Sequence, residues 1–174
     1  MGGPDRRDRP TLIDKLGFLV RFWELKGRHA AMGEPLAASE QVELLSLMQL
    51  VTSDCKMPPA GPCDRPRNAL PGQVIGEGTI LAVEIRYVCA AAVLVASHKA
   101  MTPGERIIVR TGDAVAGAEF SLPCTIAWVY GESPYIMALA IDGVPTRSTL
   151  GESMLGESRG LGMFSIGRHA RLVG

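Results

Sequence analysis

Between residues 78 and 144 the chain alternates short apolar runs with residues that form turns. The runs are rich in Val, Ile, Thr and aromatic residues, and clusters of Gly, Pro, Asp and Ser separate them. Within the first run, alternation puts Glu84 and Arg86 on one face, and Ile85 and Tyr87 on the other. Such alternation is typical of a sheet with one wet face and one core face. The pattern therefore predicts a small antiparallel barrel or sandwich of short strands.

The same alternation predicts which side of the sheet the barrel tryptophan occupies. Trp128 and Ile126 are two residues apart within one apolar run, so both side chains should point to the same face. We expect this run to be a central strand, with Trp128 buried in the core beside Ile126.

A first helix is predicted from Thr11 to about Ala31. Thr11 is a suitable N-cap, and Asp14 can complete a capping box with it. Apolar residues spaced three and four apart cover more of this helix than a single stripe, so we expect burial on more than one side. One side carries Phe18, Phe22 and Leu25, and the adjacent side carries Leu12, Leu16, Leu19 and Trp23.

A second helix is predicted from Ser39, as its N-cap, to about Val51, after a break at residues 33–35. The two helices can pair as an antiparallel hairpin. We expect one side of the first helix to lie on Leu45 and Met48 of the second, or on the barrel. In the alternative arrangement, both helices simply cap the barrel and the first is sandwiched between the second and the sheet.

The apolar surface of the first helix exceeds what one barrel contact needs, which favours a protein-binding role. Its partner is another copy of the chain or a different protein. The candidate partner-binding residues are Phe18, Phe22, Trp23 and Leu25.

These elements place the chain in the class of mainly β proteins with α: a small antiparallel β-barrel preceded by an N-terminal helical hairpin. Residues 52–72 hold five prolines and are expected to form a linker without regular structure. Residues 163–166 are expected to form a short strand or turn. The predicted parts are a flexible arm at 1–10, the hairpin at 11–51, the linker at 52–72, the barrel at 73–147 and a Gly-rich tail at 148–174.

The charge balance narrows the range of partners. Lys and Arg together number 18 and Asp and Glu together number 18, so the formal net charge is zero. Non-specific nucleic-acid binding needs a basic excess, and we expect none here. The chain has no apolar run of about 18 residues and no signal-peptide pattern, which predicts a cytoplasmic protein without membrane insertion.

The candidate reactive residues do not form a recognisable motif. Three histidines lie in separate regions, and an enzyme with a Cys–His nucleophile pair is the catalytic alternative. Cys89 and Cys124 fall in predicted strands with apolar neighbours, where thiols are usually inert. We therefore predict no catalytic residues, and no metal or disulfide, because the cysteines lack close-spaced pairs. They are Cys55, Cys63, Cys89 and Cys124.

Several local sequence patterns follow one another between residues 64 and 141 in an order that is known from a protein family. An arginine-bearing segment, residues 64–67, precedes the strands, and a turn of small residues, 89–92, follows a strand that runs through Ile85. Apolar runs at 124–130 and 136–141 end the series. In this order the chain resembles a PilZ domain, a small antiparallel barrel that binds cyclic di-GMP in many bacterial proteins.

The chain departs from the two motifs that ligand-binding PilZ domains carry, RxxxR and [D/N]xSxxG. Only Arg65 and Arg67 stand in the arginine segment, at two-residue spacing, although spacing sets the geometry of arginine forks. Tyr87, Cys89 and Ala92 replace the Asp or Asn, the Ser and the Gly of the turn. These replacements remove hydrogen-bonding groups and a close backbone approach, so we expect no tight cyclic di-GMP binding.

The resemblance implies a non-enzymatic bacterial regulatory adaptor without a cofactor. Such a protein would act through protein–protein interaction in motility, polarity or surface behaviour. The alternative is a cyclic di-GMP receptor with an altered site, in which Arg65, Arg67 and Arg86 hold the ligand in another way.

Overall fold

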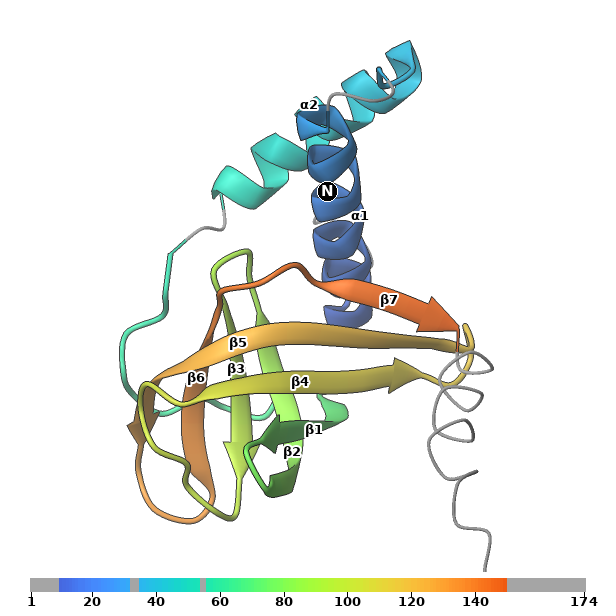
Figure 1. Ribbon diagram of the computed structural model, residues 1–174. Helices are drawn as coiled ribbons and strands as arrows, with labels where there is room; N and C mark the ends of the chain where they lie inside the picture. Colours follow the sequence, from blue (N-terminus) through green and yellow to red (C-terminus); the bar gives the residue numbers. More distant parts are fainter. Residues whose placement is uncertain (1–9, 32–34, 54–55, 150–174) are drawn as a thin grey trace, which may run out of the picture.

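A computed structural model describes residues 10–31, 35–53 and 56–149. Nearly all of the predicted arm and tail, including the short strand or turn expected at 163–166, therefore lies outside the described residues. Within these described ranges two helices precede seven strands (Figure 1), which confirms the mainly β class with an N-terminal helical pair. The helices are α1 (Leu12–Ala30) and α2 (Ala38–Ser53). The strands are β1 (Leu70–Gly76), β2 (Thr79–Val88), β3 (Ala92–Ser97), β4 (Arg106–Asp113), β5 (Ala118–Tyr130), β6 (Tyr135–Ile141) and β7 (Thr146–Thr149).

Strands β1 to β6 close into an antiparallel barrel. The order is β4-β1-β2-β3-β6-β5, and closure follows because β4 pairs with both β1 and β5. The long strand β5 pairs with β4, β6 and β7 along its length, and β7 adds to it from Ala118↔Thr149 to Ser121↔Thr146. A closed barrel still has open ends, and one of them faces the helices.

Helix α1 begins at the predicted N-cap and closes one end of the barrel. The Thr11 backbone N–H donates to Asp14 Oδ2 at 2.9 Å, and the Asp14 N–H donates to Thr11 Oγ1 at 3.2 Å, which confirms the capping box. Leu12, Leu16 and Leu19 are buried in the same core cluster as the inward residues of the strands. The capping arrangement is therefore the one that α1 adopts.

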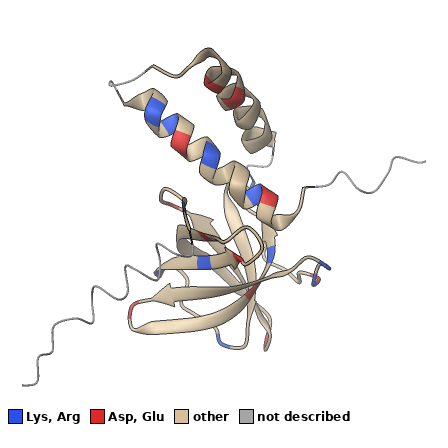
Figure 2. Ribbon diagram, turned by 90° about the vertical axis from the view of Figure 1, so that its right-hand side faces the viewer, with Lys and Arg blue, Asp and Glu red and all other residues tan. Residues whose placement is uncertain are grey.

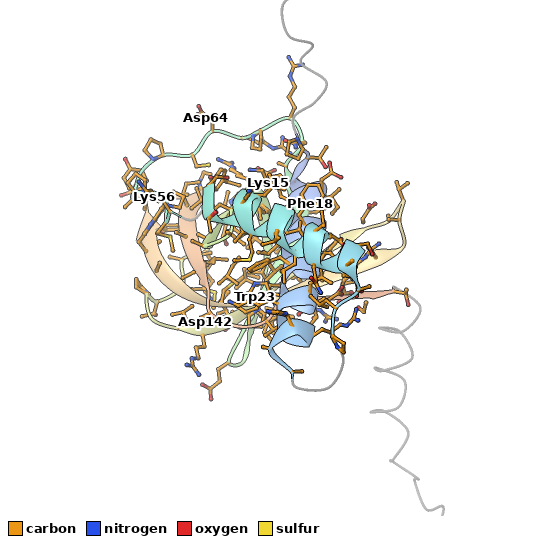
Figure 3. All side chains as sticks on the ribbon, turned by 90° about the horizontal axis from the view of Figure 1, so that it is seen from above. Lys15, Phe18, Trp23, Lys56, Asp64 and Asp142 are labelled. Atoms are coloured by element: carbon orange, nitrogen blue, oxygen red, sulfur yellow. The ribbon has the colours of Figure 1, made fainter. Side chains whose placement is uncertain are left out.

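Helix α2 packs on the second half of α1. Leu44 and Leu47 are buried with Phe22 and Leu25, and α2 crosses over α1 when the molecule is seen from above (Figure 3). The predicted N-cap is wrong: α2 begins at Ala38, so Ser39 lies inside the first turn. The Glu40 carboxylate accepts the Ala37 N–H at 3.0 Å at this end of the helix.

Two arginine–glutamate pairs join the helices on their exposed side. Arg21 donates to both carboxylate oxygens of Glu43 at 2.9 Å, and Arg28 Nη1 donates to Glu40 Oε1 at 2.6 Å. The Arg21 guanidinium holds the pKa of Glu43 below its usual range. Exposed ion pairs contribute little to the free energy of folding, so we infer that these two pairs mainly orient the helices. The burial of Phe22 and Leu25 provides most of the stabilisation between α1 and α2.

The boundaries of the linker and barrel differ from the prediction by a few residues. Thr52 and Ser53 belong to α2, where the Thr52 hydroxyl donates to the Met48 carbonyl at 2.8 Å. Strand β1 begins at Leu70, and β7 continues to Thr149. The linker is therefore shorter than residues 52–72, and the strands extend past residue 147.

A β-bulge in each of two strands changes which residues face the core. In β2 the pairing register shifts between Ile85 and Tyr87, and in β5 it shifts between Ile126 and Trp128. One extra residue reverses the faces of all residues that follow it. Alternation in β2 holds as predicted up to the buried Ile85, after which Val88 turns inward and Tyr87 outward.

The prediction that Trp128 is buried in the core beside Ile126 is wrong for this reason. Ile126 is buried in the barrel core, whereas Trp128 is only half-buried and lies outside that core cluster. The bulge at Ala127 puts the two side chains on opposite faces of β5.

We predict that Leu16→Ala will lower the free energy of unfolding by about 2–5 kcal/mol, because Leu16 is fully buried where α1 enters the barrel. Urea unfolding followed by far-ultraviolet circular dichroism will measure the change. The matched control is Leu50→Ala on the exposed surface of α2, which should cost much less. A loss below about 1 kcal/mol in Leu16→Ala would show that the barrel does not depend on this closure.

Candidate functional site

The outer face of β2, β3, β6 and β5 is covered as well as the inner one. All six residues of β3 are buried, although only Val93 and Val95 belong to the barrel core. Leu94 and Ala96 point to the outside and are buried there. One row of register partners crosses the outer face from β5 to β2: Trp128, Ala138, Leu94 and Tyr87.

A segment that we name the strap, residues 56–69, covers this outer face. It leaves α2, runs down one side of the barrel and passes behind β6 and β3 to reach β1 (Figure 1). Trp128 Nε1 donates to the Pro58 carbonyl at 3.0 Å, and Arg86 Nη1 donates to the Cys63 carbonyl at 2.6 Å. The residues predicted as a linker thus pack on the barrel, and sequence periodicity gave no signal of this.

The structure brings two of the three candidate ligand-binding arginines together around one carboxylate. Arg65 Nε donates to Glu84 Oε2 at 2.6 Å, and Arg86 Nε donates to Glu84 Oε1 at 3.0 Å. Arg67 is exposed, and no ion pair with another described residue is found for it. Glu84 partly neutralises the two guanidinium groups and would repel a phosphate brought to them.

At the three turn positions that differ from the ligand-binding motif, the side chains make contacts within the protein. Ala92 and Cys89 are buried, and the Cys89 N–H donates to the Ala92 carbonyl at 2.9 Å. Tyr87 lies under Lys15 of α1, whose Nζ is 5.2 Å from the ring centroid and 3.3 Å from the Val88 carbonyl. Helix α1 therefore packs against the turn whose sequence was compared with the ligand-binding motif.

A cavity of about 290 Å³ lies where α1, the end of α2 and this turn meet. Its walls are mainly apolar and bring Phe18, a predicted partner-binding residue, close to the turn residue Cys89. Figure 3 shows Lys15 and Phe18 beside the crossing helix α2. The cavity is also lined by the apolar residues Leu19, Leu50 and Val51.

Most of the predicted partner-binding residues of α1 are used for internal packing. Phe22 and Leu25 are buried between the helices. Trp23 is half-buried, with its ring edge-on to Phe22 at 5.9 Å and with Lys26 Nζ 4.7 Å from its centroid. Of the four, only Phe18 is exposed in the structure.

The surplus apolar surface lies on α2 instead. One side of α1 was expected to lie on Leu45 and Met48 or on the barrel; both of these α2 residues are exposed, and α1 contacts the barrel and the buried Leu44 and Leu47 instead. We name three exposed apolar residues on one side of α2 the hairpin patch: Val42 at 64%, Leu45 at 63% and Met48 at 45% exposure. Leu50 is also exposed, but it lies on another side of the helix, at the cavity. Because the apolar residues of α2 are spread around the helix among polar ones, its sequence could not show which side would pack on α1.

The hairpin patch carries no charged side chain. Both acidic residues of α2, Glu40 and Glu43, bind arginines of α1, and residues 44–53 contain no charge. Figure 2 shows the two acidic positions on α2 and none beyond them. Val42, Leu45 and Met48 follow one another at three-residue spacing, so they share one side of the helix.

The reactive residues do not assemble into a catalytic arrangement among the described residues. Burial, with a smaller effect of Asp142, raises the pKa of the Cys124 thiol to about 12, and burial also raises that of Cys63. His98 is exposed, with Nδ1 3.4 Å from the Ser133 hydroxyl. Within the described ranges, no group of three or more His, Cys, Asp or Glu side chains is placed to hold a metal. The helices described there are not long and apolar enough to cross a membrane.

We predict that alkaline pH will destabilise the protein through Cys124. Above pH 9 the thiol ionises in the unfolded chain but stays protonated in the fold, so the free energy of unfolding falls as pH rises towards 12. Between pH 8.5 and 10 wild type should lose about 1 kcal/mol more than Cys124→Ala. Urea unfolding at the two pH values measures this, and equal losses would contradict a protonated buried thiol.

Comparison of the chain with protein-family models found no matching family, and comparison with curated proteins found no match. The resemblance to a PilZ domain therefore depends on the order of local features in residues 65–144 and stays a prediction. What the structure establishes is the closed barrel, the strap on its outer face and the exposed hairpin patch.

Proposed function

We propose that this protein is a non-enzymatic bacterial regulatory adaptor with a PilZ-like barrel, and that it acts by binding another protein through its helical hairpin. The observation that carries the proposal is the hairpin patch, where α2 exposes three large apolar side chains on one side. Soluble proteins seldom leave such side chains grouped on one element unless a partner covers them.

The chemistry of the hairpin patch favours a protein partner over an ionic ligand. Its residues offer no charge and few hydrogen-bonding groups, so affinity would come from burying apolar surface. An apolar helix face or groove of another protein supplies the matching surface. Because α1 is anchored in the barrel core, a partner bound on α2 is held in a fixed relation to the barrel.

The region of the barrel that would correspond to a cyclic di-GMP site supports an adaptor that does not bind this ligand tightly. Glu84 occupies the space between Arg65 and Arg86, and the strap lies over the adjacent face. The proposed adaptor therefore needs no cofactor. The resemblance to PilZ domains suggests that it acts in the bacterial cytoplasm, in motility, polarity or surface behaviour.

We predict that Leu45→Glu will abolish partner capture and any self-association, because it puts a charge in the middle of the hairpin patch. The measurements are sedimentation velocity of the full chain and affinity capture quantified against wild type. Thermal melting should shift by no more than a few degrees, since Leu45 makes little contact with the fold.

Val115→Glu is the matched control, because Val115 is an apolar residue 99% exposed on the β4–β5 turn, outside the hairpin. It should leave capture and association unchanged. The proposal is wrong if Leu45→Glu keeps both properties, or if both variants lose them equally.

We predict no tight binding of cyclic di-GMP to the purified full chain, because the arginines are paired with Glu84 and the turn is buried. Isothermal titration calorimetry is the test. Saturable binding with a Kd of about 1 µM, equivalent to roughly −8 kcal/mol, would favour the altered-receptor alternative over the adaptor.

A further inference from the structure

The strap is held on the barrel through its carbonyl groups. It contains Pro58, Pro59, Pro62 and Pro66, which have no N–H to donate to a sheet. Side chains of the barrel supply the donors instead: Cys89 Sγ lies 3.7 Å from the Lys56 carbonyl, and Trp128 and Arg86 donate to the carbonyls of Pro58 and Cys63. The strap is thus bound as an extended peptide ligand would be, by side-chain donors that reach its backbone oxygens.

Trp128 is the central contact of this arrangement. The β5 bulge turns its indole outward, and Nε1 donates to Pro58 at 3.0 Å. Beside it on the outer face lies Ala138, and Ala96 and Ala140 occupy neighbouring outward positions. These short side chains leave room for a backbone to lie close to the sheet. An aromatic side chain above a shallow floor, donating to a proline carbonyl, is the chemistry by which aromatic grooves recognise proline-rich peptides.

From this geometry we infer that the outer face of β2, β3, β6 and β5 is a recognition surface for proline-rich peptides, and that the strap is its resident occupant. The partner that fits is an extended proline-rich segment of another protein. The proposal is independent of the hairpin patch, because it uses a different surface and a different kind of ligand.

The contacts of the strap also specify the sequence that the surface prefers. Pro58 marks the tryptophan position, Cys63 offers a carbonyl to Arg86 five residues later, and Arg65 reaches Glu84 seven residues later. A matching peptide therefore carries a proline followed, seven residues on, by a basic residue. Figure 3 shows Lys56 and Asp64 on the strap at the rim of the barrel, with Asp64 outside these contacts.

A tethered strap competes strongly with a peptide added in solution, since a short flexible tether gives an effective concentration on the order of millimolar. A variant with a weakened strap is therefore needed. In the full chain, Pro58→Gly, Pro62→Gly, Pro66→Gly and Arg65→Ser loosen the strap but leave the barrel face intact. Trp23→Phe in the same chain makes Trp128 its only tryptophan, because the sequence has two.

The probe is a synthetic peptide of residues 56–67 with Cys63→Ser, titrated while Trp128 fluorescence is recorded. We expect saturable binding to the weakened-strap variant, and at least tenfold weaker binding to the chain with the native strap. A scrambled peptide of equal composition should not bind. Glu84→Gln should weaken the native peptide more than a peptide with Arg65→Ala, because only the former uses the carboxylate.

Failure of the weakened-strap variant to bind at 1 mM peptide (on the order of the effective concentration above), with its circular dichroism unchanged, overturns the inference. Equal binding of the scrambled peptide also overturns it. If that variant does not fold, the Trp23→Phe chain with its native strap is titrated to several millimolar. A saturable emission shift specific to the native peptide then supports the proposal, and no such shift contradicts it.

Discussion

Closure of the barrel end by α1 is the contact on which the rest of the structure depends. A six-stranded antiparallel barrel satisfies its backbone hydrogen bonds around the ring, but its ends expose the inward side chains to water. Leu12, Leu16, Leu19 and Val20 cover one end and join the same core as Val74, Val95 and Leu139. Once the first half of α1 is committed to the barrel, only its second half is available to α2. Phe22 and Leu25 then bury Leu44 and Leu47, and the opposite side of α2 is left exposed.

The outer face of the barrel obeys a second constraint. Strands β3 and β6 carry apolar or small residues on both faces, so the sheet needs a cover outside as well as inside. The strap provides it without forming a strand, because its prolines cannot donate to a ladder and side-chain donors hold its carbonyls instead. The strap is also the chain segment that joins the hairpin to the barrel. The two surfaces proposed to bind partners are therefore covalently connected, and release of the strap would free the hairpin from one of its attachments to the barrel.

At the candidate dinucleotide site, the carboxylate of Glu84 pairs with the two arginines that a phosphate would need. Arg65 and Arg86 converge, as a phosphate site would require, but they converge on Glu84 and on a carbonyl of the strap. The turn that would approach the ligand is buried under α1. Around Tyr87 and Cys89, a helix and a proline-rich segment of the same chain make the nearest contacts: Lys15 of α1 lies over the Tyr87 ring, and Cys89 Sγ is 3.7 Å from the Lys56 carbonyl.

The sequence by itself determined the elements: two helices, the Thr11–Asp14 capping box and a series of antiparallel strands, because these follow from local spacing and turn chemistry. The tertiary structure decided which faces were covered. A bulge of one residue at Ala127 turned Trp128 outward, and period-two reasoning cannot detect such an insertion. The apolar residues of α2 are spread around the helix, so its packing side was undetermined until α1 had been placed. The strap was predicted as an unstructured linker because its prolines exclude regular elements, and its attachment depends on donors far away in the chain that become neighbours only after the barrel closes.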